Sequence, residues 1–185
     1  MTGPMIRAAA REKAARVTLL LLDVDGVLTD GRIIYDADGR EIKAFHVRDG
    51  HGIKMLQRAG VEVGIITGRR SAVVEIRARE LGITLVRQGA SDKVAVWRDI
   101  IGEKRLAPEE TAYVGDDLVD IPVMRSAGFA AAVADAEADV IEAADYVAGR
   151  RGGRGAVREI IDFLLRARGA WESATAAYFG SGDGR

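Results

Sequence analysis

The chain has 185 residues, and its hydrophobic share of 48% is large enough to bury one core without cross-links. Its 27 basic and 28 acidic side chains give a formal net charge of -1, so no overall field favours nucleic acid or an anionic membrane. The lack of cysteine excludes disulfides, thiolate catalysis and cysteine zinc sites, and it is compatible with a reducing cytosol. We therefore expect a single cytoplasmic domain over residues 1–185 that binds neither nucleic acid nor membrane.

Residues 1–16 are predicted to form a short basic helix. The apolar run that follows has only about six residues, fewer than the ~7–15 of a secretory signal core, and it ends in acidic residues instead of a small-residue cleavage site. No segment approaches the ~20 apolar residues that a membrane helix needs. The helix should therefore lead into a core strand.

Residues 17–22 form that apolar run, which stops at Asp23 and Asp25. Residues i and i+2 of an extended chain share a side, so both carboxylates can approach one point as the strand ends, and Gly26 permits a sharp exit. Two carboxylates in this arrangement suit a cation and a phosphoryl group.

Residues 32–46 interrupt the pattern of the rest of the chain. Two short runs flank Asp36-Ala-Asp-Gly39, which is a turn signature. We expect a β-hairpin inserted between the first strand and the first helix of the core. An insertion there overhangs the carboxyl ends of the strands, where open α/β sheets bind ligands, so the hairpin is a candidate cap or assembly surface.

Further apolar runs alternate with stretches of helical length, and glycines stand where helices should end. This alternation predicts a doubly wound, Rossmann-like α/β fold, with a parallel sheet and helices on both faces. The expected strands are 17–22, 61–66, 83–86, 111–114 and 129–133, and the expected helices between them are 50–59, 71–81, 92–101 and 117–127.

The C-terminal part begins with a Gly/Arg-rich stretch, residues 149–155. It has no interleaved aromatic residues, so a loop is favoured over a segment that binds nucleic acid. An amphipathic helix over 156–168 completes the core of residues 17–168. The tail 169–185 is rich in Gly, Ala and Ser, and we expect it to be mobile.

Four local signatures follow successive strands: Asp23-Val-Asp25, Thr67-Gly-Arg69, Lys93 and Gly115-Asp-Asp-Leu-Val-Asp120. Each alone has an ordinary explanation as a turn, a strand exit, a solvated lysine or a helix cap. Together and in this order they resemble the haloacid dehalogenase-like hydrolase superfamily.

Phosphoryl transfer explains why these residue types belong together. The transition state spreads charge over the equatorial oxygens and needs cations around it and an in-line nucleophile. Asp23 can be that nucleophile and form an aspartyl phosphate, while Asp25 can protonate the leaving alkoxide and later deprotonate water. Thr67 and Lys93 would bind the phosphoryl oxygens.

Magnesium prefers oxygen ligands and screens the repulsion between carboxylate and phosphate. We expect the carboxylates of Asp23 and Asp116 to bind it, and the resemblance adds the backbone carbonyl of Asp25. Asp117 and Asp120 are expected outside the ligands, where they would orient them. An EF-hand calcium loop is rejected. Counted from the first aspartate as position one, glycine stands at position four here, whereas that loop has it at position six.

Longer motifs are similar to the 3-deoxy-D-manno-octulosonate 8-phosphate phosphatases. They include Asp25-Gly-Val-Leu-Thr-Asp-Gly31, Val47-Arg-Asp-Gly-His-Gly-Ile53 and Gly152-Gly-Arg-Gly-Ala-Val-Arg-Glu159. The resemblance covers nearly all of residues 17–165. It implies a magnesium-dependent phosphatase of lipopolysaccharide biosynthesis and a homotetramer, in which the hairpin builds the assembly and a neighbouring subunit completes each site.

The same resemblance implies contacts with the sugar-acid phosphate. By position, these contacts would be Asp25, His46, Val47, Arg48, Asp49, Gly50, Lys54, Arg69, Arg77 and Lys93. His46 departs from the asparagine expected there, and imidazole is larger and titrates near neutral pH, so the sugar preference stays open.

Three alternatives remain beside the leading interpretation. A close one is a phosphatase for a nine-carbon, sialic-acid-type ulosonate phosphate. A second is a non-catalytic assembly domain, although every catalytic position is filled. A third is a phospho-receiver module, but its aspartate would follow a later strand and would lack the partner two residues on.

Overall fold

In the computed structural model, which describes residues 3–179, seven strands form one sheet, and only the first runs antiparallel to its neighbour. The predicted parallel α/β fold is thus confirmed. In sheet order, the strands are β1 (Met5–Ile6), β9 (Tyr146–Val147), β8 (Phe129–Ala132), β7 (Thr111–Gly115), β2 (Leu19–Leu22), β5 (Glu62–Thr67) and β6 (Leu85–Gln88).

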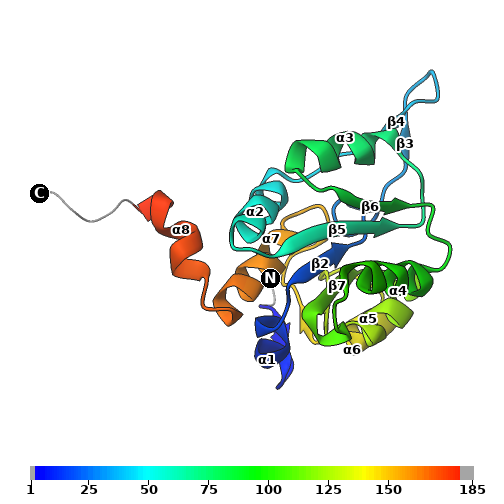
Figure 1. The fold of residues 1–185 in the computed structure, drawn as a ribbon. Coiled ribbons are helices and arrows are strands. Elements are labelled where there is room, and N and C mark those ends of the chain that lie inside the picture. The colour runs from blue at the N-terminus through cyan, green and yellow to red at the C-terminus, as the bar shows by residue number, and fades with distance from the viewer. Residues whose placement is uncertain (1–2, 180–185) are drawn as a thin grey trace, which may run out of the picture.

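Strand β2 is buried inside the sheet, between β5 and β7 (Figure 1). Its four leucines are all fully buried, and they alternate between two cores: Leu20 and Leu22 belong to one, Leu19 and Leu21 to the other. Because successive side chains of a strand point to opposite faces, an unbroken apolar run is what a strand covered on both sides requires.

Helices cover both faces of the sheet (Figure 1). The first core lies under α1 (Ala10–Ala15), α2 (Val47–Arg58), α3 (Ala72–Leu81) and α7 (Ala156–Ala167). The second lies under α4 (Lys93–Lys104), α5 (Ile121–Ser126) and α6 (Ala138–Ala143). Two short 3-10 helices, η1 (Pro108–Glu110) and η2 (Leu118–Asp120), flank β7.

The helices that follow β5 and β6 begin with side-chain caps. Ser71 Oγ accepts a hydrogen bond from Val74 N at the start of α3, and Asp92 Oδ1 accepts one from Ala95 N at the start of α4. Such caps satisfy backbone N–H groups that have no partner within the helix. The Asp92 cap fixes the first turn of α4, whose first residue is Lys93.

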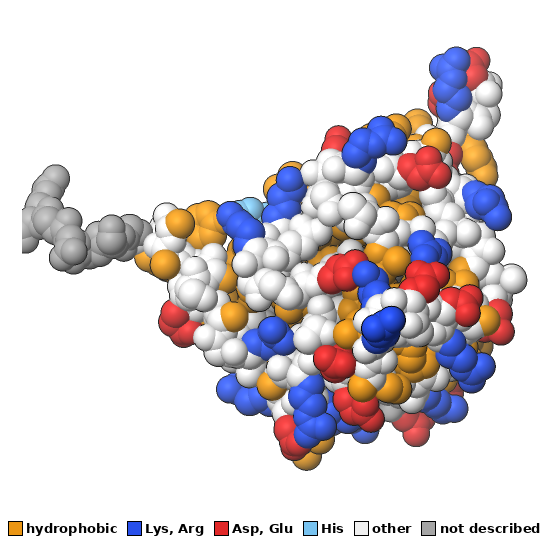
Figure 2. Space-filling model, in the orientation of Figure 1, with side chains coloured by type: hydrophobic (Ala, Val, Ile, Leu, Met, Phe, Trp, Pro, Cys, Tyr) orange, Lys and Arg blue, Asp and Glu red, His pale blue; other side chains and the backbone are white. Residues whose placement is uncertain are grey.

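The expected hairpin is present as β3 (Ile34–Tyr35) and β4 (Glu41–Ile42), which pair with each other and not with the main sheet. The Asp36 carboxylate holds the turn, because its Oδ1 accepts hydrogen bonds from the N atoms of Asp38 and Arg40. Figure 2 shows the hairpin as a projection from the body, with charged side chains at its tip.

Both chain ends differ from the expectations. The helix expected over 1–16 spans only Ala10–Ala15, because Met5 and Ile6 pair with β9 at the sheet edge. The tail, expected to be mobile, contains helix α8 (Trp171–Phe179), which packs on α7 and α2. There the Arg166 guanidinium lies 3.9 Å from the centre of the Trp171 ring. Residues 1–2 and 180–185 of these segments lie outside the described residues.

Within residues 3–179, none of the helices combines the length and the apolar character that a crossing of a membrane requires.

Candidate active site

The site lies where the carboxyl ends of three neighbouring strands meet. Asp23 follows β2, Thr67 ends β5 and Asp116 follows β7. Parallel strands deliver such residues to one edge of the sheet, and open α/β sheets bind ligands there. An open cleft of about 340 Å³ occupies this edge and is lined by Asp23, Asp25, Gly31, Thr67, Gly68, Arg69, Lys93, Asp116, Asp117 and Val119.

Acidic oxygens gather at the floor of this cleft. One carboxylate oxygen each from Asp23, Asp116 and Asp120 lies within 4.8 Å of the others. Asp23 Oδ1 and Asp116 Oδ1 are buried and have no hydrogen-bond partner among the described residues. A Cβ atom at Gly26, whose φ is +92°, would overlap Asp116 Oδ2, so the turn after Asp25 lies directly on this carboxylate. Unpartnered oxygen donors of this kind fit a hard cation such as magnesium.

The electrostatics of the cluster also favour a cation. Burial, together with the neighbouring charges of Asp23 and Asp120, raises the pKa of Asp116 to about 7. Burial likewise raises the pKa of Asp23 to about 6, although Lys93 opposes the shift. Both carboxylates are costly to ionise in the metal-free protein, and a bound cation would offset that cost.

Asp120 is fully buried and plays a different part, because both its oxygens are already bonded. Oδ1 accepts from Lys93 Nζ at 2.6 Å and from the Tyr113 hydroxyl at 2.8 Å. Oδ2 accepts from the backbone N–H groups of Asp116 and Asp117. Asp120 thus orients Lys93 and the chain that carries Asp116, and Asp117 caps η2 through a bond to Leu118 N.

Lys93 is buried beside the residue expected to be the nucleophile. Its Nζ lies 3.0 Å from Asp23 Oδ2 as well as 2.6 Å from Asp120 Oδ1. Burial lowers the pKa of Lys93, but the charges of Asp23 and Asp120 outweigh it, so the net shift is upward. The ammonium group therefore keeps its charge beside the Asp23 carboxylate.

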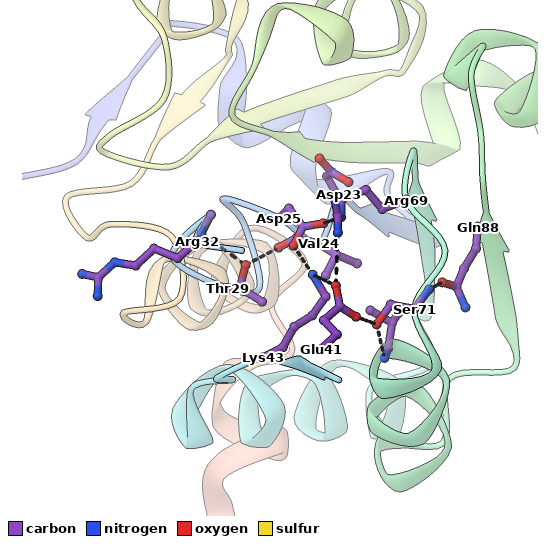
Figure 3. Close-up of polar contacts among 12 residues, drawn as sticks. Asp23, Val24, Asp25, Thr29, Arg32, Glu41, Lys43, Arg69, Ser71 and Gln88 are labelled. Atoms are coloured by element: carbon purple, nitrogen blue, oxygen red, sulfur yellow. Dashed lines mark hydrogen bonds and ion pairs between the residues drawn. The ribbon is translucent and has the colours of Figure 1, made fainter. Parts of the chain in front are cut away.

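Asp25 lines the cleft, and Lys43 of the hairpin points toward it (Figure 3). Its Oδ1 accepts a hydrogen bond from Lys43 Nζ, and Arg69 Nε lies 3.7 Å from its Oδ2. Lys43 also contacts Glu41 on the same hairpin. Neither Lys43 nor Glu41 was among the residues predicted from the sequence. The sequence did hold one indication of their role. Glu41 and Lys43 alternate with the apolar Ile42, so their charged side chains share one side of the strand.

The predicted substrate contacts divide into two groups. Asp25, Arg69 and Lys93 line the cleft, whereas the others lie along α2 and α3 and do not line it. Val47 is 80% exposed, Arg48 and Lys54 are exposed, and Arg77 lies over Gly50 and the Phe45 ring.

Asp49 and His46 occupy the start of α2. Asp49 is buried, and its Oδ1 accepts from Arg158 N at the start of α7. His46 Nδ1 lies 4.0 Å from Asp49 Oδ2, and the pKa of Asp49 is raised by burial. In this conformation, the Asp49 carboxylate joins two helices and does not point into the cleft.

Comparison with known proteins gives a consistent result. Residues 47–128 match the family model of the haloacid dehalogenase-like hydrolases. The chain is 50% identical over 172 residues to the 3-deoxy-D-manno-octulosonate 8-phosphate phosphatase KdsC of Escherichia coli strain K12. The aligned residues make up 93% of this chain and 91% of that protein.

Solved structures agree with this. The phosphatase of this name from Yersinia pestis is similar with a TM-score of 0.86 and 47% identity over 88% of both chains. The phosphatase from Moraxella catarrhalis was solved in complex with a magnesium ion, a phosphate ion and KDO, which is 3-deoxy-D-manno-octulosonate. It has a TM-score of 0.90 and 39% identity, and the match covers 91% of this chain and 97% of that one.

Proposed function

Because the chain belongs to the 3-deoxy-D-manno-octulosonate 8-phosphate phosphatases, within the haloacid dehalogenase-like hydrolases, we propose that it hydrolyses this sugar-acid phosphate through an aspartyl phosphate on Asp23. The chain is thus a phosphatase. The observation that carries the proposal is the buried contact of Asp23 with Lys93, beside two carboxylate oxygens that have no hydrogen-bond partner among residues 3–179.

The reaction would proceed in two steps at Asp23. Its carboxylate attacks phosphorus, the bond from phosphorus to the sugar oxygen breaks, and Asp25 gives its proton to the leaving alkoxide. Water then attacks the phosphorus of the aspartyl phosphate and gives a proton to Asp25. The bond from phosphorus to the Asp23 oxygen breaks, which restores Asp23 and releases inorganic phosphate. Lys93 and Thr67 hold the phosphoryl oxygens during both steps.

Asp23, Asp116 and the backbone carbonyl of Asp25 would hold the metal ion. When bound, magnesium neutralises the negative charge that otherwise repels a phosphate from these carboxylates. The magnesium in the Moraxella catarrhalis structure supports this choice of ion. Asp120 keeps its oxygens for Lys93 and the backbone, so its part is to orient the other residues.

Phosphate release from a panel of sugar-acid phosphates tests this function. We expect the eight-carbon 8-phosphate to be hydrolysed with the highest kcat/KM, and chelation of magnesium to abolish the activity. Asp23→Asn should be inactive, whereas Asp99→Asn, an exposed change on α4, should match the wild type. A higher kcat/KM for a nine-carbon 9-phosphate would contradict the proposed substrate. Full activity of Asp23→Asn would contradict the assignment of Asp23 as the nucleophile.

We also propose a homotetramer in which subunits share their active sites. Two observations support it: the hairpin exposes apolar side chains, among them Ile34, Tyr35 and Ile42, and the predicted contacts on α2 and α3 do not line the cleft of their own chain. Light scattering should give the mass of four chains for the wild type and a smaller mass for Ile34→Glu/Ile42→Glu. A wild-type monomer with full activity would contradict the shared site.

The cytoplasmic location remains a prediction.

A further inference from the structure

Two charged side chains of the hairpin, Lys43 and Glu41, contact residues that line the catalytic cleft: Lys43 contacts Asp25, and Glu41 contacts Arg69. Lys43 lies on an exposed element, yet only 1% of its side chain is accessible to solvent. Its Nζ contacts Asp25 Oδ1 on one side and lies 3.3 Å from Glu41 Oε1 on the other (Figure 3). A buried ammonium group is costly unless it is paired, and here it has two carboxylate partners.

Glu41 is itself held by the core of the protein. The Ser71 hydroxyl donates a hydrogen bond to Glu41 Oε2, and Arg69 Nη2 lies 3.4 Å from Glu41 Oε1. Burial raises the pKa of Glu41, but the hydrogen bonds from Ser71, Lys43 and Arg69 lower it overall, so this carboxylate stays charged. Ser71 caps α3, and its N atom donates to Gln88 Oε1 of β6 at 2.6 Å. The contacts therefore run from Gln88 of β6 through Ser71 and Glu41 to Lys43.

Asp25 is left with one free oxygen. Lys43 occupies Oδ1, whereas Oδ2 is buried and has no hydrogen-bond partner among residues 3–179. Arg69 Nε is 3.7 Å from Oδ2, which permits attraction but not a hydrogen bond. The carboxylate is thus fixed at one oxygen and open at the other.

We propose that Lys43, held by Glu41, is a positioning residue that orients Asp25 so that its Oδ2 exchanges protons with the substrate. This inference rests on the proposed function, because it takes Asp25 as the group that protonates the leaving alkoxide and deprotonates water. Without Lys43, the charges of Glu41 and Asp25 would face each other unscreened, and Asp25 would turn away from its reactive orientation. The same hairpin carries the exposed apolar residues, so assembly through them would also fix Lys43.

Lys43→Met tests the inference, because it keeps an unbranched side chain of similar length and removes the ammonium group. Two substrates separate the effects: the sugar-acid 8-phosphate, whose alkoxide must be protonated as it leaves, and p-nitrophenyl phosphate, whose phenolate leaves without a proton. We expect kcat for the sugar-acid phosphate to fall about 100-fold, within the range typical of a general acid, while KM stays within about threefold. With p-nitrophenyl phosphate, the first turnover should stay fast and later turnovers slow, which gives a burst of nitrophenol.

Three controls make the result decisive. Arg40→Met removes an exposed charge from the hairpin tip and should behave as the wild type. Lys43→Arg keeps the charge and should recover part of the rate. The thermal shift produced by magnesium should be unchanged in Lys43→Met, which shows an intact fold and metal site. If Lys43→Met does not fold, Glu41→Gln weakens the anchor of Lys43 and should show the same dependence on the leaving group.

Several outcomes would overturn the inference. A raised KM with unchanged kcat in Lys43→Met would show that Lys43 is a substrate ligand. An equal loss of rate in the first turnover of both substrates would show that its role is purely structural. Wild-type rates in both Lys43→Met and Glu41→Gln would remove the role altogether while leaving the proposed function intact. A wild-type enzyme that hydrolyses neither phosphate would remove the proposed function and this inference with it.

Discussion

Lys93 and Asp23 form a buried ion pair, in which Nζ of the lysine lies 3.0 Å from Oδ2 of the aspartate. Removal of one partner from such a pair strands the other charge in the interior. Lys93→Met should therefore lower the free energy of unfolding of the metal-free protein at pH 8 by about 3–5 kcal/mol, measured by urea denaturation. The second change in Lys93→Met/Asp23→Asn should restore part of this loss.

The cost of Lys93→Met should also depend on pH. A carboxyl group with a raised pKa is protonated when the pH falls below that pKa, and Asp23 already has a pKa of about 6 with Lys93 present. The loss should thus be smaller at pH 5 than at pH 8. Lys104→Met removes the ammonium group from a partly exposed pair with Glu62 and should cost less than about 1 kcal/mol at either pH. A loss for Lys93→Met no larger than this control would contradict the buried pair.

Asp116→Asn should stabilise the metal-free protein at pH 8. Burial and two neighbouring carboxylates raise the pKa of Asp116 to about 7, so its charge at pH 8 opposes folding. The amide removes that charge, and we expect the melting temperature without magnesium to rise by a few degrees, since ~1 kcal/mol corresponds to ~2–4 °C in a domain of this size. Magnesium should no longer shift the melting temperature. A lower melting temperature without magnesium would show that Asp116 stabilises the fold.

Magnesium binding should weaken as the pH falls from 8 to 5.5. The metal requires ionised carboxylates, whereas the metal-free pKa values of about 7 for Asp116 and about 6 for Asp23 mean that protons compete with it in this range. Because of these raised pKa values, the folded metal-free protein binds more protons than the unfolded chain, so its stability falls as pH rises from about 4 to 7. Titration calorimetry at several pH values measures the first effect. An affinity independent of pH would contradict the raised pKa values.

Gly26→Ala should abolish magnesium binding and activity. A methyl group at Gly26 would overlap Asp116 Oδ2, and the backbone φ of Gly26, +92°, is unfavourable for alanine. Gly39→Ala is the matched control, since its φ is also positive, at +76°, but nothing lies within 4 Å of the added Cβ. Both variants should lose a similar amount of stability from backbone strain, and Gly39→Ala should keep its thermal response to magnesium. An equal loss of magnesium binding in both would point to strain as the cause.

Local patterns in the sequence predicted the strands that carry the site. The leucines of β2 form an unbroken run because both faces of that strand are covered, and the run ends where Asp23 begins. The order of the carboxylates, Thr67 and Lys93 along the chain then predicted neighbours in space, because consecutive parallel strands end at one edge. Strands β1 and β9 were not predicted, since two residues are too few to show a period.

Other features depend on contacts between distant residues. Lys43 and Asp25 are 18 residues apart and meet only because the hairpin returns the chain to the end of β2. Composition indicated a mobile tail over 169–185 and gave no sign of helix α8, which forms through distant contacts. Arg58 Nη2 donates to the Tyr178 hydroxyl at 2.8 Å, and the Arg166 guanidinium lies over the Trp171 ring. The side chain of Asp49 points toward α7 because the start of that helix offers it a free N–H group, which no local pattern indicates.

The central claim, that Asp23 accepts the phosphoryl group, is tested most directly by rapid acid quench of the wild-type enzyme during turnover of the eight-carbon sugar-acid 8-phosphate, followed by peptide mass spectrometry. The account predicts a transient phosphate on Asp23 that forms before free phosphate accumulates and that is absent from Asp23→Asn. Release of phosphate at the full rate with no phosphorylated Asp23 at any time would contradict it.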